Sequence, residues 1–78
     1  MKYSNYFALI FKEKGIPNLS VKEHIRLFNI VHTEGVLKGM PKGDSLQRFR
    51  VEKQLTELTG NLKPEKLLEE MLRFSSVD

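Results

Sequence analysis

Helix-capping residues are the strongest constraint on how this chain folds. "SVKE", residues 20–23, has the form of a capping box, in which Ser20 accepts from the backbone N–H of Glu23 and the Glu23 carboxylate reaches back. "DSLQ", residues 44–47, repeats this pattern with Asp44 and Gln47. Pro64 suits a first helical turn, where its missing N–H has no partner to lose. These signals predict three helix starts.

Glycines supply the matching stops. Gly15, Gly35 and Gly60 are each followed within two residues by an apolar side chain, the usual pattern of a left-handed helix terminator. Starts and stops together predict four helices, over residues 3–14, 20–34, 45–59 and 64–74.

Three of these helices carry an apolar stripe at helical spacing, which is typical of a face that packs into a core. The predicted core residues are Tyr3, Tyr6, Phe7 and Ile10; Val21, Ile25, Leu27, Phe28 and Val31; and Leu67, Leu68, Met71 and Phe74. The pattern predicts an all-α fold, a small four-helix bundle or three helices plus an N-terminal helix. We expect one domain over 1–78, with a Gly/Lys-rich loop at 35–44 and a short flexible tail at 75–78.

The size of the chain limits how stable that fold can be. A chain of 78 residues buries roughly 60% of its unfolded surface, and such small cores often need a disulfide, a metal or a partner. There is no cysteine, so disulfides and thiolate zinc sites are excluded. Self-association is therefore expected. Because no apolar run approaches the length of a membrane span, we also expect a soluble, cytoplasmic protein without a membrane partner.

The third predicted helix differs from the others because it has apolar side chains on two sides. At 100° per residue, Val51, Leu55 and Leu58 share a narrow arc, whereas Leu46 and Phe49 project from nearly the opposite side. A single small bundle has difficulty covering both sides.

Two interpretations follow for the second side. Its first turn could tuck under the 35–44 loop, which would bury both side chains. Alternatively, Leu46, Phe49, Arg50 and Lys53 form a contact patch for another protein or a second copy, since aromatic residues beside arginine are common at interface centres. We call these four residues the Phe49 patch.

Several chemistries do not fit the sequence. Gly39 and Gly43 lack the spacing of a phosphate-binding Walker loop, and Asp44 occupies the place an anion would take. His24 and His32 are two helical turns apart, roughly 12 Å, too far to share one metal ion. No nucleophile or acid–base pair is evident. We expect no enzyme activity, no cofactor, no metal and no small-molecule substrate.

Nucleic acid is the remaining alternative. Residues 1–43 carry seven Lys/Arg against three Glu, a net charge of +4, whereas residues 44–78 carry six against seven, a net of −1. The first two helices could form a helix-turn-helix, with the second reading DNA. The candidate contacts are the outer arc Lys22, Arg26, Asn29 and Thr33, together with Lys38, Lys42 and Arg48.

The sequence therefore favours a non-catalytic binding protein, an adaptor, inhibitor or regulatory subunit, that acts through protein–protein contacts and self-associates. The alternative is a DNA-binding transcriptional regulator that uses the helix at 20–34 and the basic loop at 35–44.

Overall fold

The computed structural model describes residues 1–75 and contains four helices in that range. They are α1 (Lys2–Lys14), α2 (Val21–Gly39), α3 (Ser45–Thr59) and α4 (Pro64–Ser75), and no residue of this range forms a strand. The all-α fold predicted from the capping residues and glycines is confirmed.

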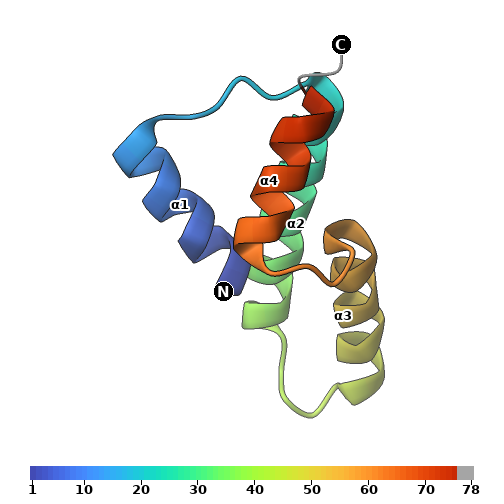
Figure 1. Ribbon diagram of the computed structural model, residues 1–78. Helices are drawn as coiled ribbons and strands as arrows, with labels where there is room; N and C mark the ends of the chain where they lie inside the picture. Colours follow the sequence, from blue (N-terminus) through green and yellow to red (C-terminus); the bar gives the residue numbers. More distant parts are fainter. Residues whose placement is uncertain (76–78) are drawn as a thin grey trace.

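α2 is the central helix and contacts both α1 and α3, while α4 packs against α1 (Figure 1). α4 runs along the N-terminal half of α2 with its last residue beside the start of α2, and α3 lies beside the C-terminal half of α2. The molecule measures 42 × 24 × 19 Å, and its radius of gyration is 13.3 Å. A compact chain of this length would have a radius of gyration of about 11.5 Å. The bundle is therefore elongated, because α3 extends past the end of the core.

The core consists of eight apolar side chains contributed by α1, α2, α4 and the segment before α2. They are Tyr3, Phe7, Leu19, Leu27, Ile30, Leu67, Leu68 and Met71. The predicted inner faces of α1 and α4 are confirmed, except that Phe74 is exposed. α3 contributes no fully buried apolar residue. Its Leu55 and Leu58 are half-buried and pack against the edge of the core.

The helix ends follow the predicted signals at several positions. Ser20 accepts from the N–H of Glu23 at 3.3 Å. Gly15 and Gly60 both adopt positive φ, with Gly60 in the left-handed helical region at φ 65°. Asp44 is the N-cap residue of α3, as predicted, but its side chain makes no capping hydrogen bond. The capping box predicted for residues 44–47 is therefore wrong.

Gly35 does not end α2, which corrects both the predicted helix at 20–34 and the predicted loop at 35–44. The helix continues to Gly39, and the loop shrinks to residues 40–44. Leu37, in the added turn, is half-buried and lies beside α3. Packing of this extra turn outweighs the small cost of a glycine inside a helix.

The buried face of α2 is also different from the predicted one. Val21, Ile25 and Phe28 are 78%, 55% and 70% exposed, and Val31 is exposed as well. Of the five predicted core residues, only Leu27 is buried. The inner face instead combines Leu27 and Ile30 with the polar residues Glu23, Thr33 and Glu34. Glu34 is bonded to α1, whereas Glu23 and Thr33 find their partners, Arg26 and the carbonyl of Asn29, within α2 itself.

The predicted tail at 75–78 begins one residue too early. Ser75 is the last residue of α4, and its hydroxyl oxygen accepts from the N–H of Ser20 at 2.9 Å. Residues 76–78 lie outside the described part of the chain.

Candidate protein-interaction site

The Phe49 patch lies on the side of α3 that faces away from the core. Leu46 and Phe49 are 64% and 63% exposed, one turn apart, and Arg50 and Lys53 are exposed beside them. The interpretation in which this turn tucks under the preceding loop is wrong. The opposite side of α3, with Val51, Leu55 and Leu58, is half-buried. The structure therefore brings the four predicted residues together on one accessible surface.

Two arginines fix α3 against α2. The Arg26 Nε atom donates to the carbonyl of Leu58 at 2.7 Å, in the last turn of α3. At the other end, Arg48 Nη1 donates to the carbonyl of Leu37 at 3.4 Å, in the last turn of α2. Both carbonyls lie in the last turn of a helix, where the regular intrahelical partners run out. The Leu37 carbonyl also accepts the N–H of Met40 at 3.3 Å. The orientation of the Phe49 patch is therefore held by hydrogen bonds at both ends of its helix.

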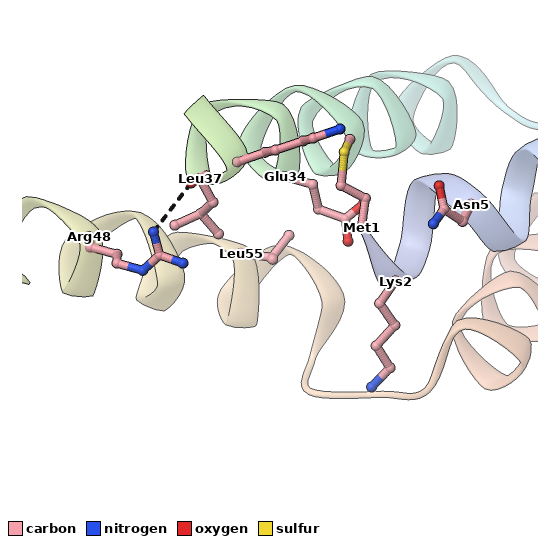
Figure 2. Close-up of a pocket in the computed structure, with 8 residues that line it drawn as sticks. Met1, Lys2, Asn5, Glu34, Leu37, Arg48 and Leu55 are labelled. Atoms are coloured by element: carbon pink, nitrogen blue, oxygen red, sulfur yellow. Dashed lines mark hydrogen bonds between the residues drawn. The ribbon is translucent and has the colours of Figure 1, made fainter. Parts of the chain in front are cut away.

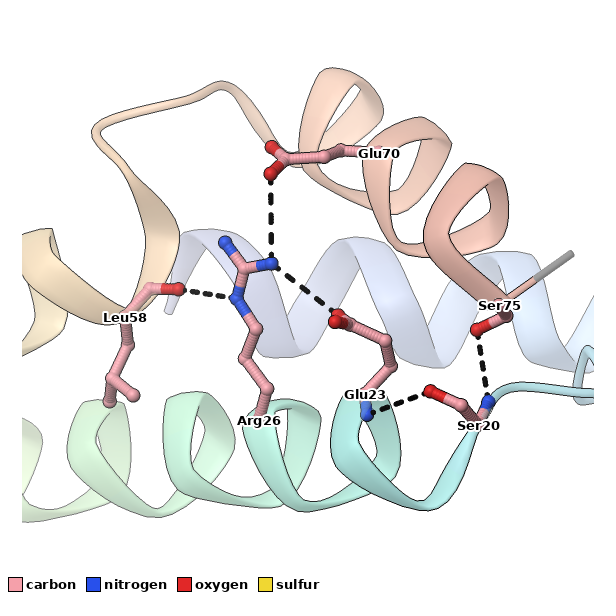
Figure 3. A network of polar contacts seen from close by, with 6 residues as sticks. All are labelled: Ser20, Glu23, Arg26, Leu58, Glu70 and Ser75. Carbon is pink, nitrogen blue, oxygen red and sulfur yellow. Dashed lines mark hydrogen bonds and ion pairs between the residues drawn. The ribbon is translucent and has the colours of Figure 1, made fainter. Parts of the chain in front are cut away.

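Arg26 also links α2 to α4 (Figure 3). Its Nη1 atom lies 3.4 Å from Glu23 Oε2 and 3.8 Å from Glu70 Oε1. The Arg26 side chain is 22% exposed and that of Glu23 only 6%. One guanidinium thus joins three helices, because its planar fork can donate in several directions at once.

The outer arc predicted for a DNA-reading helix is present only in part. Lys22 and Asn29 are exposed, as are Lys38 and Lys42. Arg26 points into the network just described, and Thr33 is buried, with its hydroxyl donating to the carbonyl of Asn29. The prediction that these two side chains face outward is wrong, because Arg26 is held by α3 and α4 and Thr33 lies on the buried side of α2.

The two histidines are separate, as expected from their spacing. His24 is half-buried with Nδ1 3.2 Å from the carbonyl oxygen of Ser20, and His32 is exposed. Within residues 1–75, no three His, Cys, Asp or Glu side chains are grouped so that they could hold a metal ion. No helix in this range is long and apolar enough to cross a bilayer.

An open groove of about 430 Å³ lies where the start of α1, the end of α2 and α3 meet (Figure 2). Its cationic lining comes from Lys2, Lys38 and Arg48, and Leu55 is its apolar lining from α3. The Glu34 carboxylate in this groove is already engaged by the backbone of α1. The groove is therefore a helix junction whose buried charge has partners within the chain.

Sequence reasoning missed two features of this surface. The first is Glu34, whose partners lie about 30 positions away, at a distance that no local pattern reveals. The second is the exposed apolar row on α2. The helical spacing of these residues was visible in the sequence, but the row was predicted to face the core and not solvent.

The chain matches no protein-family model, no curated protein and no solved structure in the comparisons made.

Proposed function

We propose that this chain is a non-catalytic binding protein, an adaptor, inhibitor or regulatory subunit, that engages another protein through the Phe49 patch. The observation that supports this proposal most is the exposure of Leu46 and Phe49 on a helix pinned at both ends. Two large apolar side chains one turn apart on a fixed helix are suited to insert into a partner without a large ordering cost.

The charges around the patch indicate the chemistry of the partner. Arg50 and Lys53 flank Phe49, while Glu52 is paired with Arg48 at 3.4 Å. We therefore expect a partner surface with an apolar pocket for Phe49 and carboxylates at its edge, since complementary charges set orientation and speed association.

Site-specific photo-cross-linking tests this function. A photoreactive phenylalanine analogue at position 49 should cross-link a defined partner in the native host, whereas the same analogue at exposed Leu9 on α1 should not. Reversing the charges of Arg50 and Lys53 to Glu should remove the position-49 product. Equal cross-linking at both positions, or none at position 49, would contradict the proposal.

DNA binding is the second candidate, and one observation favours it. The two acidic residues of α2, Glu23 and Glu34, are both buried, so the exposed side of this helix carries cations and no carboxylate. Lys22, Lys38 and Lys42 could contact phosphates. Against this stands the apolar centre of the same side, formed by Val21, Ile25 and Phe28.

Salt titration separates this candidate from the first. If the chain binds DNA through Lys22, Lys38 and Lys42, the logarithm of the affinity should fall by about 0.9 per contacted phosphate for each unit of log salt. Lys22→Ala together with Lys42→Ala should then flatten that slope. Unchanged binding in this double variant would exclude the basic face as the DNA contact.

A further inference from the structure

α2 carries a row of exposed apolar side chains that nothing in the described chain covers. Val21, Ile25, Phe28 and Val36 form this row, which we call the α2 stripe. Val21, Ile25, Phe28, His32 and Gly35 are spaced alternately by four and three residues, and Val36 lies four residues after His32. This is the spacing of helices that pack side by side over several turns. The partners of α2 within the chain, at Leu27, Ile30 and Glu34, lie on the opposite side.

The total surface of the molecule is larger than a chain of this size should expose. A folded monomer of 9.1 kDa exposes about 4,900 Å², by the usual scaling of surface with mass. This chain exposes 5739 Å². The excess of roughly 800 Å² equals what one partner contributes to a standard protein interface. This excess accompanies the elongated shape of the bundle and is of the size that a subunit covers when it associates.

We propose that the α2 stripe is the interface of a two-fold symmetric homodimer in which two α2 helices pack antiparallel. This assignment uses a surface separate from the Phe49 patch, so it does not depend on the function proposed above. The stripe runs from Val21 to Val36, and Phe28 lies near its middle. A two-fold axis beside Phe28 places Phe28 next to its equivalent and Val21 opposite Val36 of the second copy.

Charge favours the antiparallel arrangement over the parallel one. Parallel helices would place equivalent lysines at the same level of the dimer and align both helix dipoles. Antiparallel helices separate the equivalent lysines and oppose the dipoles. Because the exposed side of α2 carries cations and no carboxylate, spreading the lysines along the contact in this way lowers their mutual repulsion.

Gly35 fits the same contact. It lies inside α2, and a Cβ atom built there would meet nothing within 4 Å, so no contact inside the chain requires a glycine. A glycine costs a helix interior roughly 0.5–1 kcal/mol relative to alanine. In the antiparallel dimer Gly35 lies close to Val21 of the second copy, where a missing side chain lets the two backbones approach.

Sedimentation equilibrium of the purified chain tests the dimer. At about 100 μM, above the micromolar dissociation constants of weak interfaces of this size, the mass should be twice 9.1 kDa. Ile25→Glu should raise the dissociation constant about 100-fold or more, because each dimer would bury two carboxylates in an apolar contact. Leu9→Glu is the matched control, since Leu9 and Ile25 are both 55% exposed, and it should remain dimeric.

The possible outcomes separate the two surfaces. Circular dichroism should show unchanged helix content in both variants, because neither side chain belongs to the core. A wild-type chain that stays at 9.1 kDa overturns the proposal, and so does an Ile25→Glu variant that remains dimeric. If Phe49→Glu rather than Ile25→Glu produces monomers, the dimer forms through the Phe49 patch and the α2 assignment is wrong.

Cross-linking then tests the direction of the helices. The sequence contains no cysteine, so Val21→Cys and Val36→Cys each introduce a unique thiol. Mixed and treated with a short bismaleimide, the two variants should give a heterodimeric product joining positions 21 and 36. Efficient 21–21 cross-linking in the first variant alone would indicate parallel helices and contradict the proposed symmetry.

Discussion

The carboxylate of Glu34 caps α1 from another helix. Its Oε2 atom accepts the N–H of Tyr3 at 2.9 Å, and its Oε1 atom accepts the N–H and the hydroxyl of Ser4, both at 2.7 Å. The N-cap residue itself, Met1, offers no side-chain acceptor. A buried negative charge at this end is also favoured by the helix dipole. α2 thereby determines where α1 begins.

We expect Glu34→Ala to lower the free energy of unfolding by about 2–3 kcal/mol. The substitution leaves two N–H groups of α1 without an acceptor, and bonds to charged groups contribute about 1.5–3 kcal/mol. Glu34→Gln keeps one acceptor and should cost less. Urea denaturation followed by circular dichroism measures the difference, with exposed Glu13→Gln as the control. A loss below about 0.5 kcal/mol, the usual scatter of surface substitutions, would show that the cap is dispensable.

Arg26→Met should destabilise the fold by about 3 kcal/mol, because it leaves the buried Glu23 carboxylate without its partner. Adding Glu23→Gln should recover part of this loss, since the uncompensated charge is then gone. Lys22→Met, one turn away on the exposed side, is the control and should change stability by less than about 0.5 kcal/mol. If Glu23→Gln makes the Arg26→Met chain still less stable, the loss in Arg26→Met does not come from an unpaired Glu23 carboxylate.

Two glycine substitutions should have opposite effects on thermal stability. Gly35→Ala should raise the free energy of unfolding of the monomer by about 0.5–1 kcal/mol, because the site is helical and open. Gly60→Ala should lower it by about 1 kcal/mol, because Gly60 has φ 65°. Calorimetry measures both, at a chain concentration below that at which the proposed dimer would form. Equal signs would contradict the assigned backbone conformations.

The local patterns in the sequence were sufficient for the ends of most helices and for the faces of α1 and α4. Ser20 and Gly60 act through neighbours within a few residues, so their effect is visible in a short window. α2 was harder to predict, because its apolar residues point outward while Glu23 and Glu34 point inward. The Glu34 carboxylate is stabilised by α1, and that of Glu23 by Arg26 of the same helix, which is itself held by α3 and α4. The apolar period of a helix does not record such contacts.

The Phe49 patch was predicted from the sequence as one of two alternatives. An apolar side chain opposite a helix's inner face must be covered by some other element, and the chain has too few elements to do so. The structure leaves Leu46 and Phe49 uncovered, which decides between the two interpretations that the two-sided pattern left open. What the sequence could not provide is the hydrogen bonds of Arg26 and Arg48 that fix the direction of α3.

The most direct test of this account compares two phenylalanines of similar chemistry and different placement. Phe7 is buried in the core, and Phe7→Ala should lower the free energy of unfolding by about 3–5 kcal/mol. Phe49→Ala should change the free energy of unfolding by less than about 0.5 kcal/mol. It should also weaken the affinity for the partner that cross-linking at position 49 identifies. Should Phe49→Ala destabilise the fold as strongly as Phe7→Ala, Phe49 belongs to the core and the proposed binding surface does not exist.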